Sequence, residues 1–98
     1  MNYDLEVSPS VIKEVTRIYF DCEGIRSGSG MRFLKELDAC YKSICANPFG
    51  CQVRKSPYRY VFLYKLKYRV VYDIKGQTVL VFQVRHTSRK PSKKFGLR

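Results

Sequence analysis

The spacing of apolar residues changes near residue 50, and this change limits the folds that the chain can adopt. Before it, apolar side chains recur every three or four residues, which is typical of amphipathic helices. After it, β-branched and aromatic residues dominate in short alternating runs, which are typical of strands. A chain of 98 residues has room for one domain with one modest core. The pattern therefore predicts a single α+β domain spanning residues 1–98.

The first half predicts a short strand and then a helix. Residues 3–7 alternate apolar and acidic side chains, as a half-buried strand does. Ser8 offers a capping hydroxyl, and Pro9 suits the first helical position because its missing N–H is not needed there. Helical spacing then continues to Glu23, and we expect Gly24 to end the helix.

A second helix follows after a short break. Residues 27–30 contain two serines and two glycines, which predict the turn of a helical hairpin. Apolar residues from Phe33 onward again mark one helical face. Asn47 and Pro48 should end this helix because proline cannot continue its hydrogen-bond ladder.

The second half predicts strands only. We expect strands at residues 52–55, 58–64, 68–74 and 78–86, with a tight turn at residues 75–77. The predicted architecture is an N-terminal strand and a helical hairpin packed on a mainly antiparallel sheet of four or five strands.

Charge is divided unequally between the two halves. The whole chain carries a formal net charge of +11, far more than solubility requires. Residues 1–50 are nearly neutral, whereas residues 51–98 hold thirteen Lys and Arg and a single acid, Asp73. Residues 87–98 form a polar, basic tail that is a candidate for mobility. The chain is therefore expected to bind an anionic partner through its second half.

Several site classes and cell locations are disfavoured. Four cysteines, Cys22, Cys40, Cys45 and Cys51, show no metal-binding spacing, and reduced thiols that act as small apolar groups are expected. We expect no metal and no cofactor. No apolar run approaches the roughly 20 residues of a membrane span, and the acidic start does not resemble a secretory leader. We therefore expect a cytoplasmic protein without a membrane partner.

The last forty residues carry a recognisable pattern. Its parts are Arg59 within residues 58–64, a strand at 66–72, a glycine turn, an apolar strand at 79–84, and His86-x-x-Arg89-x-Pro91. Together with Ser8-Pro9 and Phe33-Leu34 at the helix starts, this pattern resembles the RelE/ParE superfamily of bacterial type II toxins. Lys67 stands where many members have proline, so another feature must set the bend into the following strand.

The resemblance implies a toxin neutralised by a cognate acidic antitoxin in bacterial cytoplasm. Two activities occur on this fold: cleavage of ribosome-bound mRNA and inhibition of DNA gyrase. Fold alone does not choose between them. We favour metal-independent mRNA cleavage from the residues, with ParE-like gyrase inhibition as the alternative.

Metal-free RNA cleavage needs a base for the 2′-hydroxyl, cations at the phosphate and an acid for the leaving oxygen. His86 is the only imidazole in the chain and the expected base or acid. Arg59 and Arg89 are expected to clamp the phosphate with their forked guanidinium groups, and Tyr68 to stack or donate a proton. The candidates for RNA and phosphate binding are Lys55, Lys65, Lys67, Arg69, Arg85 and Phe95.

Each of these residues also has a structural interpretation. His86 at a strand end can serve as a hydrogen-bonding group, and gyrase-directed members share the same His-x-x-Arg ending. Arg59 can pair with Glu36 or Asp38 and serve only the fold. Alternating aromatics such as Tyr60 are more often core and sheet-face residues than stacking platforms.

Overall fold

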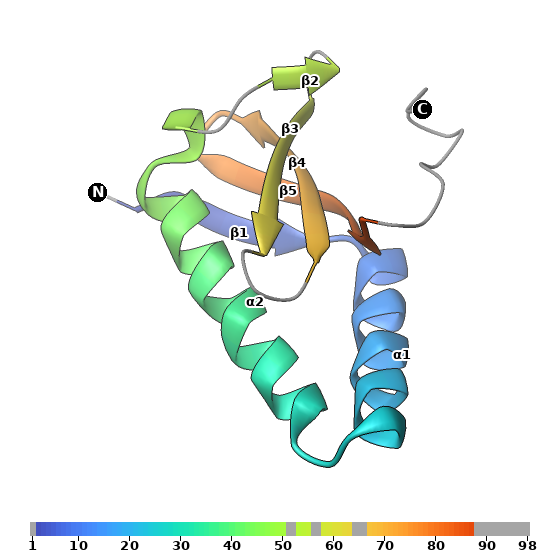
Figure 1. Ribbon diagram of the computed structural model, residues 1–98. Helices are drawn as coiled ribbons and strands as arrows, with labels where there is room; N and C mark the ends of the chain where they lie inside the picture. The colour runs from blue at the N-terminus through green and yellow to red at the C-terminus, as the bar shows by residue number, and fades with distance from the viewer. Residues whose placement is uncertain (1, 51–52, 56–57, 64–66, 88–98) are drawn as a thin grey trace.

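The computed structural model describes residues 2–50, 53–55, 58–63 and 67–87, with the backbone alone for 53–55. The elements, in order, are β1 (Asp4–Val7), α1 (Pro9–Ile25), α2 (Ser29–Ala46), a short 3-10 turn (Pro48–Gly50), β2 (Val53–Lys55), β3 (Tyr58–Leu63), β4 (Tyr68–Lys75) and β5 (Thr78–His86). The predicted α+β order is confirmed. Figure 1 shows the two helices as a hairpin whose turn points away from the sheet.

The strands form one sheet in the order β1-β5-β4-β3-β2. β1 pairs with β5 in parallel, and every other pairing is antiparallel. The turn between β4 and β5 is made by Gly76 and Gln77, one residue shorter than expected, because Lys75 still belongs to the strand. Gly76 has a φ of 58°, which a residue without Cβ adopts at little cost.

The first helix starts as predicted and ends later. The Ser8 hydroxyl accepts a hydrogen bond from the Val11 amide at 3.3 Å, with Pro9 as the first helical residue. Gly24 was expected to end this helix, and that prediction is wrong. The helix continues through Ile25, and the backbone amide of Arg26 donates to the carbonyl of Cys22 at 2.9 Å. A glycine costs only about 1 kcal/mol inside a helix, so the preceding helical turns outweigh it.

The hairpin turn depends on Glu23. The cap position of α2 is Gly28, which has no side chain to offer. The Glu23 carboxylate replaces it and accepts hydrogen bonds from the amides of Gly28 and Gly30 at 3.1 and 2.7 Å. These bonds lower the pKa of Glu23 below its usual value near 4.5, because amide donors favour the charged form. Gly30 is buried beside α1, so the two helices approach closely there.

The helices cover one face of the sheet, which we call the helix-covered face. Its core contains Val11, Ile18, Phe33, Leu37 and Ile44 from the helices, and Leu63, Val70, Tyr72, Val79, Val81 and Val84 from the strands. Tyr72 is fully buried, and its hydroxyl donates to the carbonyl of Pro48 at 2.6 Å. The side chains that alternate to the other side define the distal face.

A β-bulge decides which residues of β5 reach each face. Tyr72 pairs with Val81, whereas the preceding Val71 pairs with Gln83, so Phe82 is an extra residue. Strict alternation from Val79 and Val81 would have placed Gln83 and Arg85 under the helices. The bulge reverses the alternation, and Val84 and His86 lie on the helix-covered face instead.

Lys67 sets the bend into β4. It has a φ of 56°, which is uncommon for a residue other than glycine. The amide of Thr87 donates to the Lys67 carbonyl at 2.7 Å and ties the bend to the end of β5. This feature stands where many relatives were expected to have proline.

The remaining sequence expectations concern thiols and membranes. Cys22, Cys40 and Cys45 are free thiols, as predicted, and Cys51 lies outside the described residues. Among the helices that the structure describes, none is long and apolar enough to cross a membrane.

Candidate functional site

The structure separates the residues that the sequence grouped into one site. Arg59, Tyr68 and His86 lie on the helix-covered face, and Arg69 and Arg85 lie on the distal face. Lys67 is exposed just before β4, and Lys55 lies in the edge strand β2. The predicted site residues Lys65, Arg89 and Phe95 lie outside the described residues.

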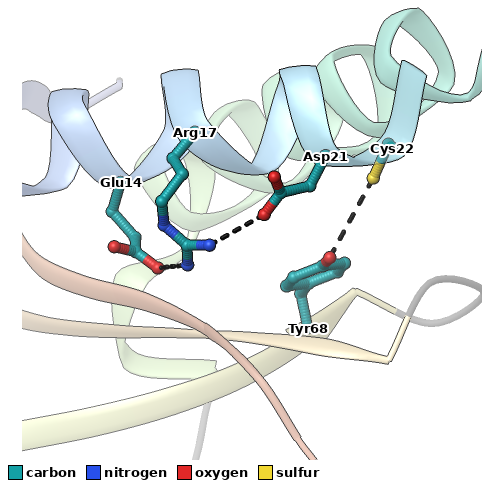
Figure 2. Close-up of polar contacts among 5 residues, drawn as sticks. All are labelled: Glu14, Arg17, Asp21, Cys22 and Tyr68. Atoms are coloured by element: carbon teal, nitrogen blue, oxygen red, sulfur yellow. Dashed lines mark hydrogen bonds and ion pairs between the residues drawn. The ribbon is translucent and has the colours of Figure 1, made fainter. Parts of the chain in front are cut away.

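His86 packs against the helical hairpin. Its ring meets that of Tyr68 edge-on, with 5.1 Å between centroids, and Tyr68 in turn contacts Phe33 at 5.1 Å. The Tyr68 hydroxyl lies 4.0 Å from the thiol of Cys22, as Figure 2 shows. The imidazole therefore lies among aromatic residues and a helix, half-buried, and not beside Arg69 and Arg85.

Arg59 lies at the far end of the same face. Tyr68 is in register with both Leu63 and His86, and Arg59 is four residues from Leu63 along β3, about 13 Å at strand spacing. The guanidinium carbon of Arg59 lies 5.3 Å from the centroid of Phe49. No ion pair to Glu36 or Asp38 is found within the described part of the chain. Arg59 and His86 thus do not share one phosphate-sized site.

Two arginines stand directly opposite each other on the distal face. Arg69 of β4 is in register with Arg85 of β5 and with Phe62 of β3. Like charges facing across a strand pair destabilise a sheet, by roughly 0.2–1 kcal/mol. Arg69 is only 9% exposed, with its guanidinium carbon 5.5 Å from the Tyr60 ring centroid.

Several polar atoms of the distal face are buried and have no hydrogen-bond partner among the described residues. Within the part of the chain that the structure describes, Nε and Nη2 of Arg69, Nε of Arg85 and Oε1 of the neighbouring Gln83 make no hydrogen bond. A buried unpaired donor costs about 1–3 kcal/mol, and more when it is charged. Several such donors in one place are therefore a local cost to folding, which is expected at a binding site.

Two described carboxylates near Arg69 and Arg85 are already engaged. Glu14 lines a shallow pocket with Gln83 and Arg85, but it is bonded to Arg17 on its own helix. Figure 2 shows Arg17 held between Glu14 and Asp21, with the Asp21 oxygen at 2.7 Å. Asp73 accepts from the Ile74 amide at 2.7 Å. Among the described residues, no carboxylate forms an ion pair with Arg69 or Arg85.

The distal face can therefore bind an anion and a flat apolar group together. Phe62 is 48% exposed beside Arg69, and Tyr58 and Phe82 meet edge-on at 5.4 Å. Forked guanidinium groups suit phosphate or carboxylate oxygens, and aromatic rings suit bases or apolar side chains. Among the described residues, no group of three or more metal-ligating side chains is found.

Sequence reasoning missed Gln83 and the partnership of Tyr60 with Arg69. Gln83 is one polar residue in an apolar strand, and nothing in its neighbourhood distinguishes it. Tyr60 was interpreted as a core or sheet-face aromatic. Its position beside Arg69 on the distal face follows from the register of β3 with β4, which the sequence does not show.

Comparisons with known proteins agree with the fold. The family model described as "ParE toxin of type II toxin-antitoxin system, parDE" matches residues 5–91. A chain of the chromosomal ParDE system from P. aeruginosa is similar, with a TM-score of 0.77 at 12% identity, covering 88% of this chain and 97% of that one. A search of curated proteins finds no match.

Two structures of the E. coli toxin RelE are also similar. A free double mutant has a TM-score of 0.67 at 22% identity, covering 90% of this chain and 86% of that one. The isolated toxin has a TM-score of 0.64 at 22% identity, covering 90% and 87%. At these identities the structural likeness shows the fold alone.

Proposed function

Since the chain belongs to the ParE toxin family of type II toxin–antitoxin systems, we propose that its toxic activity is inhibition of DNA gyrase by binding. As a type II toxin it has a cognate antitoxin. We place the contact with gyrase on the distal face, around Arg69 and Arg85. DNA gyrase and ribosome-bound mRNA are both found in bacterial cytoplasm, so we propose that the toxin acts there.

The position of His86 carries this proposal. The chain has one histidine, and it lies on the helix-covered face against Tyr68. Arg69 and Arg85, which have buried nitrogens without hydrogen bonds among the described residues, lie on the distal face. RNA cleavage needs a proton acceptor within hydrogen-bond reach of the attacking 2′-hydroxyl. The cations must bind the phosphate next to that hydroxyl, so base and cations must lie together. Binding to an acidic protein surface needs the cations and aromatic residues only.

Cleavage of ribosome-bound mRNA is the second candidate function, and the facing pair of Arg69 and Arg85 supports it. Two guanidinium groups beside Phe62 and Tyr60 match the phosphate and base of an unpaired nucleotide. The fold is similar to that of RelE as well as that of ParDE. Three residues expected in a nuclease site, Lys65, Arg89 and Phe95, lie outside the described residues.

An acidic antitoxin fits the charge of the chain under either activity. The net charge of +11 attracts an anionic protein and speeds the encounter. We propose that the antitoxin contributes carboxylates to the basic half of the toxin.

The test is to induce the chain in cells without its antitoxin and to assay purified gyrase with the same protein. We expect blocked supercoiling, an SOS response and intact transcripts. Arg69→Met should weaken gyrase inhibition on the order of 10- to 100-fold, because a charged hydrogen bond contributes about 1.5–3 kcal/mol. Lys13→Ala removes an exposed cation from α1 and is the matched control.

His86→Ala separates the two candidates. It should leave gyrase inhibition intact if the toxin acts by binding. Codon-phased cuts in transcripts that disappear in His86→Ala, with gyrase unaffected, would overturn the proposal and establish the nuclease. For about six phosphate contacts, RNA affinity would fall by roughly three decades between 50 and 200 mM salt.

A further inference from the structure

A further pocket lies away from the distal face, between the turn of the helical hairpin and the adjacent ends of β4 and β5. It has a volume of about 240 Å³. Its lining residues are Cys22, Ile25, Ser29, Arg32, Phe33, Tyr68 and His86. Two of them, Tyr68 and His86, are residues that the proposed toxic activity does not use.

The polar groups of this pocket are mainly hydrogen-bond donors. Arg32 contributes a guanidinium group, Ser29 and Tyr68 contribute hydroxyls, and His86 an imidazole. Among the described residues that line it, none carries a carboxylate. The described side chains therefore give the pocket a positive character without an internal counter-charge.

Two neighbouring carboxylates, Asp21 and Glu23, are bonded to other groups. Asp21, which precedes Cys22 in α1, accepts a hydrogen bond from Arg17 at 2.7 Å. Figure 2 shows this contact. Glu23 caps the second helix. Arg32 makes no ion pair within the described residues, including with Glu36 one turn later. An anion in the pocket would meet an uncommitted guanidinium group.

The rest of the lining is apolar and aromatic. Phe33 is fully buried and packs at 5.1 Å against Tyr68, so the wall of the pocket is fixed. Ile25, 88% exposed, stands at the rim. A cavity of roughly 150 Å³ is enough to hold a benzene ring. The pocket therefore has room for one ring and a carboxylate.

From this combination we propose that the pocket binds a carboxylate attached to a small apolar or aromatic body. The carboxylate lies against Arg32 and Ser29, and the apolar body lies against Phe33 and the Tyr68–His86 pair. This site is distinct from the distal face, and its occupancy does not depend on the target of the toxin.

The test uses the single histidine as a reporter. The imidazole Cε1–H signal of His86 is unambiguous in an NMR spectrum because the chain has no other histidine. Titrating benzoate into the isolated chain should move this signal saturably. Benzyl alcohol, with the same ring but no charge, and inorganic phosphate, with charge but no ring, should each bind at least tenfold more weakly.

Variants connect the signal to the pocket. Arg32→Gln should weaken benzoate binding at least tenfold, because the charged hydrogen bonds are lost. Arg26→Gln, a change of the same kind at an exposed residue outside the pocket, should leave the affinity unchanged. The proposal is overturned if benzoate gives no saturable shift, if benzyl alcohol binds equally well, or if Arg32→Gln binds like the parent chain.

The carboxylate can come from a free acid or from an acidic side chain of the antitoxin. Repeating the titration on the toxin–antitoxin complex distinguishes these sources. If benzoate no longer moves the His86 signal in the complex, a carboxylate of the antitoxin occupies the pocket. A benzoate shift that persists assigns it to a free acid.

Discussion

The two faces of the sheet are built from alternate residues of the same strands, yet they differ in how well their groups are satisfied. On the helix-covered face, Val70 and Tyr72 are fully buried and packed. On the distal face, Arg69 and Gln83 are nearly as buried but carry polar atoms without partners among the described residues. Burial with satisfied contacts stabilises a fold, whereas burial without them is a cost that binding can offset.

We infer that the two faces of the sheet have different roles. The helix-covered face supplies most of the stability, and we propose that the distal face supplies the contact with the target. Variants on the helix-covered face should therefore lose stability, whereas variants on the distal face should lose toxicity.

Phe33→Ala should have the largest effect on stability. The side chain is fully buried under the helices, and its removal should lower the free energy of unfolding by roughly 3–5 kcal/mol. Phe62→Ala is the matched change on the distal face, where the ring is 48% exposed, and it should cost about 1 kcal/mol or less. Urea unfolding measures both. Equal losses would remove the contrast between the faces.

Gly30→Ala should have the next largest effect. A Cβ at Gly30 would lie 2.7 Å from the backbone oxygen of Tyr19, so the two helices must separate. We expect a loss of about 1–3 kcal/mol. Gly24→Ala is the control, because a Cβ there meets nothing within 4 Å and should stabilise α1 by about 0.5–1 kcal/mol. A stabilised Gly30→Ala would show that the hairpin is not closely packed.

Tyr72→Phe tests the hydrogen bond from Tyr72 to Pro48 inside the helix-covered face. The change leaves the ring in place but removes the hydroxyl that donates to Pro48, so it should cost about 1 kcal/mol. Thermal or urea unfolding is sufficient to detect this loss. No change in stability would mean that water replaces the hydroxyl without cost.

Glu23 makes the hairpin turn sensitive to acid. Its folded-state pKa is lowered by amide donors, so its contribution is present above the usual value near 4.5 and is lost as pH falls through the folded pKa. Hydrogen exchange at Gly28 and Gly30 should therefore become relatively less protected in acid. Glu23→Gln should weaken that protection at pH 7 and abolish its acid dependence. Unchanged protection in this variant would contradict the assignment.

Sequence patterns predicted most of the fold because helices and strands leave clear periodicities. Ser8, Pro9 and Pro48 marked helix ends correctly, since capping and proline geometry are local. The prediction that Gly24 ends α1 was wrong, because the cost of one glycine is smaller than the stabilisation that packing gives to the helix. The positive φ of Lys67 depends on a contact with Thr87, twenty residues away, so no local signal indicated it.

The candidate site was harder to predict because it depends on one bulge. The extra residue Phe82 exchanges the faces of Arg85 and His86 relative to the start of β5. Residue types alone indicated Arg69, Arg85 and His86 as one group. Only the register shows that the arginines and the imidazole are on opposite sides.

The most direct test of this division is to measure toxicity and stability together in Arg69→Met. Methionine keeps much of the apolar stem and removes the buried charge opposite Arg85. We expect growth arrest to be lost while the free energy of unfolding is unchanged or rises by about 1–3 kcal/mol, because methionine removes the buried unpaired donors of Arg69. Retained growth arrest, or a loss of toxicity accompanied by several kcal/mol of lost stability, would contradict the assignment of function to the distal face.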